Sequence, residues 1–160
     1  MANCGSLGIP EHLHTNGKAP DHNFDPDELY YRRFASVDEI SSAGGISESA
    51  ISTQNMSGNR SKYSAPDDVL FNINSSEHFT SWGVWEVDIA AICELAFTHP
   101  VEARNYTVRV VHTPEECMYP HAEIQILENG EPVKRIKSTV VKTKIREAIS
   151  HLTRITKRPR

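Results

Sequence analysis

The sequence lacks the features that mark membrane proteins and small secreted domains. No stretch approaches the roughly 18 apolar residues that a membrane-spanning helix needs, and the N-terminus has no basic start followed by an apolar run. Only three cysteines are present, Cys4, Cys93 and Cys117, far apart and odd in number. They do not form the paired framework of a small secreted domain. We therefore expect reduced thiols, a buried Cys93 within the apolar run 89–97, and a soluble, cytoplasmic protein.

Standard catalytic and cofactor motifs are also missing. There is no Gly-x-x-x-x-Gly-Lys phosphate loop, no Gly-x-Gly-x-x-Gly, no Gly-x-Ser-x-Gly elbow and no His-Glu-x-x-His. His12 and His14, with His22 nearby, provide a means of adventitious metal capture but do not predict an ordered site. The sequence therefore predicts no cofactor and no metal.

Basic residues are scarce outside the C-terminal part of the chain. Residues 134–160 hold ten of the seventeen Lys and Arg residues and a single acid, Glu147, whereas residues 1–133 hold the other twenty acids. The formal net charge of −4 conceals this polarity. A split of this kind points to nucleic acid, to an acidic protein partner, or to self-pairing of oppositely charged ends. The candidate contact residues are Lys137, Lys142, Lys144, Arg146, Arg154, Lys157 and Arg158.

The same charges have a second interpretation. Lys142, Lys144 and Arg146 lie off the apolar stripe of their segment, and positive charge near a helix C-terminus is favourable through the helix dipole. A solvated helix face followed by a frayed end at 157–160 would give the same pattern. Sequence-specific DNA reading is not expected, because no helix-turn-helix pair or zinc-finger spacing is visible.

Local patterns in the first two thirds of the chain predict alternating strands and helices. Residues 27–34 bunch aromatic side chains and indicate a first strand, whereas residues 36–62 are rich in Ser, Gly and Asn and indicate a long irregular connection. Residues 64–71 begin like a helix, with Ser64 as cap and two acids in the first turn. A strand is expected over 82–89, continued by a helix that starts near Asp88 and ends before Pro100.

The last third contains the clearest signals. Residues 106–113 are rich in β-branched side chains and predict a strand, with His112 as a surface or strand-end residue. Residues 121–127 alternate apolar and polar and meet Asn129-Gly130, the strongest short hairpin signal, so 133–141 should pair with them. An amphipathic helix of about four turns is predicted by an apolar stripe spaced by three and four residues. Its members are Val141, Ile145, Ala148, Ile149, Leu152 and Ile155.

These elements predict an α+β protein. We expect a mostly antiparallel sheet with a C-terminal hairpin, and amphipathic helices on one face. Residues 1–27 contain several Gly and Pro residues without hydrophobic periodicity, which indicates a flexible leader. Residues 28–156 form the single domain of this prediction, and residues 157–160 form a basic C-terminal end.

One polar segment suggests a catalytic site. His121-Ala122-Glu123 contains the His-x-Glu that opens the zinc deaminase signature, but the later Pro-Cys-x-x-Cys is missing, since no cysteine follows Cys117. On a strand, His121 and Glu123 project to the same face. The pair is therefore either part of a catalytic site or two polar residues on the solvent-exposed face of an antiparallel sheet.

A second polar cluster lies at 59–64, just before the predicted helix. Arg60 and the hydroxyl of Tyr63 could hold a phosphate, because guanidinium groups and helix N-termini both favour oxyanions. The alternative is a solvated connector. With Arg60 on a phosphate, His121 as general acid or base and Glu123 as its complement, metal-independent phosphodiester cleavage is chemically feasible.

Three segments carry a resemblance to known sequences. The strings Leu-Tyr-Tyr-Arg-Arg-Phe at 29–34, Arg-Ser-Lys-Tyr-Ser-Ala-Pro-Asp-Asp-Val-Leu-Phe at 60–71 and His-Ala-Glu-Ile at 121–124 resemble small uncharacterised bacterial proteins with no established activity. The resemblance covers about residues 28–127. It implies no mechanism.

A second resemblance is to ADP-ribosyltransferase-like domains, which use an Arg on an early strand, a Ser or Tyr on a middle strand and a Glu on a late strand. It implies Arg32 or Arg33, Ser61 or Tyr63, and Glu123 in these roles. The compact Gly-rich nicotinamide loop of such domains is not evident in the sequence.

Two functional hypotheses follow. The first is a binding or accessory module that contacts nucleic acid or a protein partner through the C-terminal basic surface. The second is an enzyme, a metal-independent nuclease or a nucleotide or ADP-ribosyl transferase, that uses Arg60, Tyr63, His121 and Glu123. The enzyme hypothesis requires Arg60 and His121 to share a cleft, because acid/base catalysis needs hydrogen-bond reach to one substrate.

Overall fold

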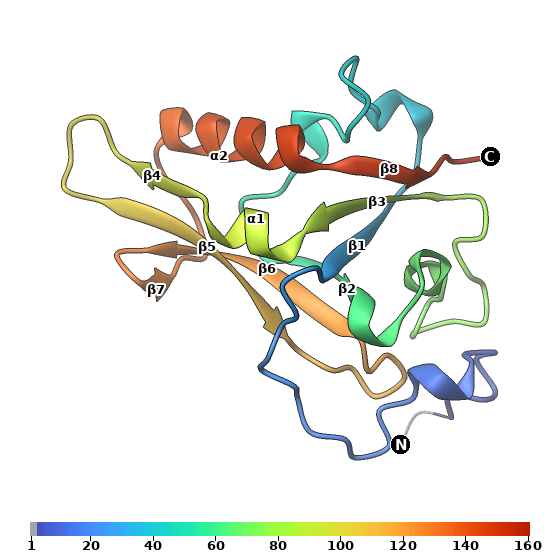
Figure 1. The fold of residues 1–160 in the computed structure, drawn as a ribbon. Coiled ribbons are helices and arrows are strands. Elements are labelled where there is room, and N and C mark those ends of the chain that lie inside the picture. The colour runs from blue at the N-terminus through green and yellow to red at the C-terminus, as the bar shows by residue number, and fades with distance from the viewer. Residues whose placement is uncertain (1–2) are drawn as a thin grey trace.

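Residues 3–160 are described by the computed structural model, and Met1 and Ala2 of the predicted leader lie outside them. The chain forms one antiparallel eight-stranded sheet in the order β4-β5-β6-β2-β1-β3-β8, with β7 added on β6. Figure 1 shows the sheet curled into a half-barrel with the long C-terminal helix α2 running along it. The prediction of an α+β protein with an antiparallel sheet is confirmed at this level.

The described residues form the following elements. The strands are β1 (Leu29–Phe34), β2 (Met56–Arg60), β3 (Gly83–Asp88), β4 (Ala96–Thr98), β5 (Asn105–His112), β6 (His121–Glu128), β7 (Glu131–Pro132) and β8 (Arg154–Lys157). The α-helices are α1 (Ile89–Cys93) and α2 (Thr139–Leu152). The 3-10 turns are η1 (Glu11–Leu13), η2 (Val37–Glu39), η3 (Glu48–Ala50), η4 (Ser61–Tyr63) and η5 (Pro66–Leu70).

The main hydrophobic core lies on the face of the sheet that α2 covers, which we call the inner face. Alternate residues of β6 are buried there, Ala122, Ile124 and Ile126, because successive side chains of a strand point to opposite faces. Val141, Ile145 and Ile149 of α2 join the same cluster. Burial of each such side chain stabilises the fold by about 1.5–3 kcal/mol. Ser138 caps the helix, its hydroxyl accepting from the Val141 N–H at 3.3 Å.

The opposite face, the outer face, carries two smaller apolar clusters. Tyr31 and Val84 of the sheet pack there against Val69 and Leu70 of η5. The second cluster joins Ile9, Leu13, Cys117 and Met118, which connects residues 3–27, the N-terminal arm, with the loop between β5 and β6. The outer face is therefore covered by the N-terminal arm and by the segment from η5 to β3, and a cavity remains between that segment and the loop that joins β5 to β6.

The N-terminal arm is packed against the sheet, contrary to the expected flexible leader. Leu13 is completely buried, and the Tyr119 N–H donates to its carbonyl at 2.7 Å. Cys4 forms a disulfide with Cys117, so the prediction of three reduced thiols is wrong for these two. The apolar residues of the arm show no period because they are buried one at a time rather than along one face.

Cys93 differs from expectation, whereas His112 is the last residue of β5, which is one of its two predicted alternatives. Cys93 is exposed, because the short helix α1 turns Ile89 and Ile92 toward the core and ends at Cys93. His112 is only 2 % exposed. Its imidazole lies between the N-terminal arm and Tyr119, accepting from the Asp21 N–H at 2.8 Å. A residue near the end of a strand is buried here because the arm returns over it.

Several predicted elements are confirmed. β1, β3, β5 and β6 lie where strands were expected, and Asn129 and Gly130 adopt positive φ angles of 50° and 83° in the β6–β7 turn. The hairpin partner is much shorter than predicted, since only Glu131–Pro132 pairs with β6 and residues 133–138 are irregular. Pro132 has no N–H with which to extend the ladder.

Other expectations are wrong. The segment 36–62 contains β2, whose sequence Met-Ser-Gly-Asn-Arg has no β-branched or aromatic residue. Gly58 serves the packing there, because a Cβ at this position would lie 2.5 Å from Cζ of Tyr30. The helix expected at 64–71 is the 3-10 turn η5, and Ile155 belongs to β8 rather than to the helix.

Candidate ligand-binding cavity

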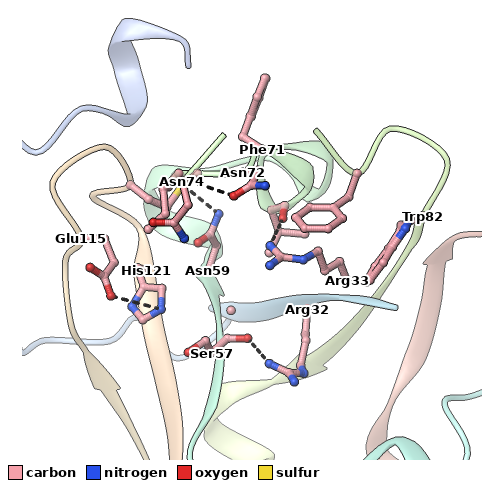
Figure 2. Close-up of a pocket in the computed structure, with 15 residues that line it drawn as sticks. Arg32, Arg33, Ser57, Asn59, Phe71, Asn72, Asn74, Trp82, Glu115 and His121 are labelled. Carbon is pink, nitrogen blue, oxygen red and sulfur yellow. Dashed lines mark hydrogen bonds and ion pairs between the residues drawn. The ribbon is translucent and has the colours of Figure 1, made fainter. Parts of the chain in front are cut away.

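A polar cavity of about 410 Å³ lies on the outer face (Figure 2). Its floor consists of β1, β2 and the start of β6, one wall comes from the loop between β5 and β6, and the roof comes from residues 69–82. Small-molecule sites in proteins usually measure about 300–1,000 Å³, are largely apolar and hold a few convergent polar groups. The cavity has this size, but its lining is more polar, with about as many polar and charged residues as apolar ones.

Strand register places three polar side chains next to one another on the floor. Asn59 on β2 is paired with Tyr31 on β1 and with His121 on β6. Arg33 follows Tyr31 by two residues, so it points to the same face one step along β1. Figure 2 shows Asn59 between His121 and Arg33, while Arg32 leaves β1 on the opposite side. The order across the floor is therefore imidazole, amide, guanidinium.

Asn59 is a buried amide with unused hydrogen-bonding capacity. The residue is 2 % exposed, and its Nδ2 contacts only the sulfur of Met118, at 3.3 Å. Its Oδ1 accepts no hydrogen bond from another described residue and is not fully enclosed, so it is accessible from the cavity. An amide side chain has two donors and one acceptor with two lone pairs, and buried polar groups are nearly always satisfied. The unused groups of Asn59 point to a ligand that supplies their partners.

Arg33 places a positive charge at the cavity that no carboxylate of the described residues neutralises. Its Nη1 donates to the Val69 carbonyl at 3.0 Å, and the guanidinium lies 4.1 Å from the ring centre of Phe79. It forms no ion pair within residues 3–160. Burial, and then the neighbouring charge of Arg32, lower the pKa of Arg33, so a bound anion would relieve an unfavourable environment. The guanidinium remains charged and has further N–H donors for such an anion.

His121 is held in a defined orientation at the other end of the floor. Its Nδ1 lies 2.7 Å from the Thr113 carbonyl and 2.9 Å from the Thr113 hydroxyl. A carbonyl oxygen only accepts, so we assign the ring hydrogen to Nδ1. Nε2 lies 4.0 Å from the carboxylate of Glu115, whose side chain is about half exposed. The imidazole therefore presents Nε2 near the cavity beside a negative charge.

Aromatic side chains roof the cavity. Phe79 and Trp82 pack on each other with ring centres 4.6 Å apart, and Phe71 packs edge-on against His78 at 5.1 Å. The roof is tied by the Asn72 N–H, which donates to Nδ1 of His78 at 3.0 Å. The cavity thus combines flat apolar surfaces above with polar groups below.

Arg60 lies elsewhere and is fully engaged. Its Nε and Nη2 donate to the Glu28 carboxylate at 2.6 and 2.8 Å, and Nη1 and Nη2 donate to the carbonyls of Asp21 and Asn23, each at 2.6 Å. The side chain is completely buried and its guanidinium also stacks over Phe24 at 4.1 Å. Arg60 therefore fixes the N-terminal arm to β1 and β2, and the expected phosphate cradle is absent because its donors are taken.

Tyr63 belongs to the same arm-binding cluster. Its hydroxyl donates to the Asp21 carboxylate at 2.6 Å, and Lys62 donates to the same oxygen at 3.0 Å. The hydrogen bond from Tyr63, the Asn23 N–H and Lys62 together hold the pKa of Asp21 well below its ordinary 3.8. Lys62 and Tyr63 are thus anchors for the arm.

The four residues proposed for catalysis are divided between the two faces of the sheet. His121 and Glu123 share the outer face of β6, as their spacing predicts, but Glu123 accepts from Asn55 and Gln125 and does not line the cavity. Arg60 follows Asn59 and points to the opposite face. Of the residues implied by the ADP-ribosyltransferase-like resemblance, Arg32 and Arg33 line the cavity and Ser61, Tyr63 and Glu123 do not.

The C-terminal basic residues are only partly free. Arg154 pairs with Glu86 and Asp88 at 3.0 and 3.1 Å, and Lys157 pairs with Asp67 at 3.1 Å. Across the described part of the chain, no ion pair is formed by the other predicted contact residues. These are Lys137, Lys142, Lys144, Arg146 and Arg158.

Residues 3–160 contain no group of three or more His, Cys, Asp or Glu side chains arranged to hold a metal ion. No helix within them is both long enough and apolar enough to span a membrane. No protein-family model matches the sequence, and no curated protein or solved structure is significantly similar to it. The interpretation of the cavity therefore depends on its own chemistry.

Two residues of the cavity carried little signal in the sequence. Arg33 appeared only through a resemblance, and Asn59 only as the first residue of the polar cluster 59–64. Their partnership depends on β2 pairing with both β1 and β6, and β2 itself was not predicted. An Arg next to aromatic residues on a strand was the one available hint.

Proposed function

We propose that the protein binds a small organic anion in the outer-face cavity. The observation that carries this proposal is the presence of two available groups on one floor. The Arg33 guanidinium pairs with no carboxylate of the described residues, and the oxygen of the buried Asn59 side chain accepts no hydrogen bond from them. A carboxylate or phosphate would pair with Arg33, because guanidinium groups bind planar oxyanions through two parallel hydrogen bonds. The aromatic roof would cover an organic body.

The residues around His121 favour a binding function over a catalytic one. An oriented imidazole can act as a general base, but acid/base chemistry also needs a nucleophile or a substrate atom within hydrogen-bond reach. The cavity is lined by no Ser, Thr or Cys other than Ser57, which is exposed. The enzyme alternative with Arg60, Tyr63, His121 and Glu123 loses support because Arg60 and Tyr63 hold the N-terminal arm.

A thermal-shift screen with small carboxylates and phosphates tests the proposal. A ligand at about 100 times its Kd stabilises the folded state by about 2.7 kcal/mol, which raises the Tm of a protein of this size by roughly 5–10 °C. Arg33→Gln should weaken a hit by about tenfold or more, since hydrogen bonds to charged groups contribute about 1.5–3 kcal/mol.

Arg109→Gln is the matched control. Arg109 is an exposed arginine on β5 whose Nε donates to Gln125 at 2.8 Å, and it lies outside the cavity. Its loss changes the net charge by the same amount. A hit that weakens equally in both variants would reflect general electrostatic attraction and would count against a cavity site.

A second candidate is the contact of nucleic acid or an acidic protein with the basic surface of α2. Lys142 and Arg146 are four residues apart and thus neighbours on the helix surface, and neither forms an ion pair within the described chain. Lys144 is exposed on the same helix. Arg154 and Lys157, paired with acids, contribute less than their charge suggests.

Fluorescence anisotropy with labelled RNA and DNA tests the second candidate, because phosphate contacts are strongest at low salt. Lys142→Gln combined with Lys144→Gln should weaken binding, whereas Lys18→Gln combined with Arg109→Gln removes the same charge from unrelated surface positions. Equal loss in both double variants, or no association at low salt, would dispose of this candidate.

We propose a compartment on the basis of the disulfide rather than of the cysteine count. A cross-link between Cys4 and Cys117 is typical of oxidising compartments and rare in the cytosol, which supports an extracellular or periplasmic location over a cytoplasmic one. Alkylation of the protein from its native source provides the test. One thiol should react before reduction and three after it. Three reactive thiols without reduction would favour the cytoplasm.

A further inference from the structure

The chemistry of the cavity floor narrows the kind of anion it would accept. Asn59 offers an unpaired acceptor, Oδ1, and an Nδ2 whose one contact is a weak one to a sulfur. An amide with both groups free matches a ligand edge that carries a donor next to an acceptor, as a lactam or a nucleobase does. A simple carboxylate would leave this buried amide unsatisfied.

The position of the anionic group is set by the charges at the two ends of the floor. Arg33 lies at the β1 end and the Glu115 carboxylate lies at the β6 end, beside His121 (Figure 2). An anion near Glu115 would be repelled, so it belongs at Arg33. Arg33 and Asn59 are diagonal neighbours on adjacent strands, a spacing of about 7–8 Å that lies within reach of long side chains, so one small ligand can contact both.

The roof favours a flat body between these two contacts. Phe71, Phe79 and Trp82 line the cavity, and the Trp82 indole N–H makes no hydrogen bond with another described residue. The Arg33 guanidinium is already stacked over Phe79, which holds its plane in one orientation. A planar ring would fill the space under the roof without displacing it.

We infer that the cavity takes a planar heterocycle that carries one anionic substituent and an amide edge, with the anion on Arg33 and the edge on Asn59. This inference rests on the proposed function. Orotate, a pyrimidine carboxylate with lactam edges, is the probe. Benzoate is the matched acid without the edge, and uracil has the edge without the acid.

Isothermal titration of the full chain with the three probes provides the test. Wild type should bind orotate at least about tenfold more tightly than benzoate, which corresponds to one satisfied hydrogen bond at about 1.4 kcal/mol. Asn59→Leu should abolish this preference and leave benzoate affinity nearly unchanged. Arg33→Gln should weaken both acids but not uracil.

Asn59→Asp keeps the shape of the side chain, removes the donor and adds a negative charge that acts on both acids. Loss of the orotate preference over benzoate in this variant too therefore separates recognition from misfolding. Thermal unfolding of both variants is measured alongside. If benzoate binds in an Arg33-dependent manner and orotate binds no more tightly, or if the preference survives Asn59→Leu, the inference is wrong and the proposed function stands. If neither acid binds, both are wrong.

Discussion

Arg60 on β2 and Glu28, the residue before β1, form a two-point ion pair in the protein interior. The distances are 2.6 Å from Nε to Oε2 and 2.8 Å from Nη2 to Oε1, and the two side chains are 0 % and 1 % exposed. The guanidinium also donates to two carbonyls of the N-terminal arm. One arginine thus joins the arm to the sheet, which gives a segment without periodic sequence a fixed position.

We predict a large loss of stability when one partner of this pair is removed. Glu28→Gln leaves the guanidinium of Arg60 buried without a countercharge, and breaking a buried pair in this way costs about 3–5 kcal/mol. The free energy of unfolding in urea provides the measurement. The double variant Arg60→Met with Glu28→Leu should recover part of the loss, because it leaves no uncompensated charge. A Glu28→Gln protein as stable as wild type would contradict the role of the pair.

The Cys4–Cys117 disulfide should contribute strongly to stability. It joins residues 113 positions apart, and closing a long loop in the unfolded chain favours the folded state. Cys4→Ser combined with Cys117→Ser should lower the free energy of unfolding by about 2–5 kcal/mol. Cys93→Ser is the control, because Cys93 is exposed and unbonded, and it should change stability little. The same loss in all variants would indicate a nonspecific effect of serine.

Stability should fall with mild acid through His112. Its Nδ1 accepts from the Asp21 N–H at 2.8 Å, and its Nε2 lies 2.6 Å from the Tyr119 carbonyl, so the folded protein holds the neutral imidazole. Burial lowers the pKa of His112 below its ordinary 6.5. Its contribution is therefore present above pH 6.5 and is lost as the pH falls through the folded-state pKa.

The difference in unfolding free energy between wild type and His112→Gln isolates this contribution from those of the other histidines. A glutamine carbonyl can accept the same Asp21 N–H but does not titrate in this range. The difference should shrink between pH 8 and pH 5. A constant difference over this range would show that His112 does not control the acid response.

Gly58 should tolerate no side chain. A Cβ there would lie 2.2 Å from the Tyr31 carbonyl and 2.5 Å from Cζ of Tyr30, whose hydroxyl donates to the Met56 carbonyl at 2.8 Å. Gly58→Ala must displace backbone or a buried ring, and overpacking of this kind costs about 1–3 kcal/mol. Gly5→Ala is the control, since its nearest atom is 3.5 Å away. Unfolding midpoints of the two variants should therefore differ clearly.

The sequence predicts the strands with β-branched or alternating patterns and the apolar stripe of α2. In these elements the positions of the apolar residues match the side chains that the fold buries. The sequence does not predict β2, since Met56 to Arg60 carries an exposed Ser, a Gly needed for ring packing and two buried polar residues. Without β2, neither the neighbours of Asn59 nor the opposite directions of Arg60 and His121 can be derived.

Arg60 and Arg33 show why the candidate site could not be predicted from the sequence either. Both are arginines near aromatic residues in the sequence, but Arg60 is satisfied by Glu28 from a distant segment, and Arg33 meets only a carbonyl and the Phe79 ring. Which arginine remains available depends on tertiary partners. The sequence therefore indicates the residue type that an anion site would use, but not which of the two arginines is left without a carboxylate.

Chemical-shift mapping by NMR tests the central claim most directly. Isotope-labelled protein is titrated with orotate and benzoate, and the side-chain amide of Asn59 and the indole N–H of Trp82 are followed. Saturable shifts of both signals, absent in Arg33→Gln and retained in Arg109→Gln, are the predicted result. Signals that stay unchanged up to the solubility limit of both acids, or that change only on the surface of α2, would contradict a ligand site in the outer-face cavity.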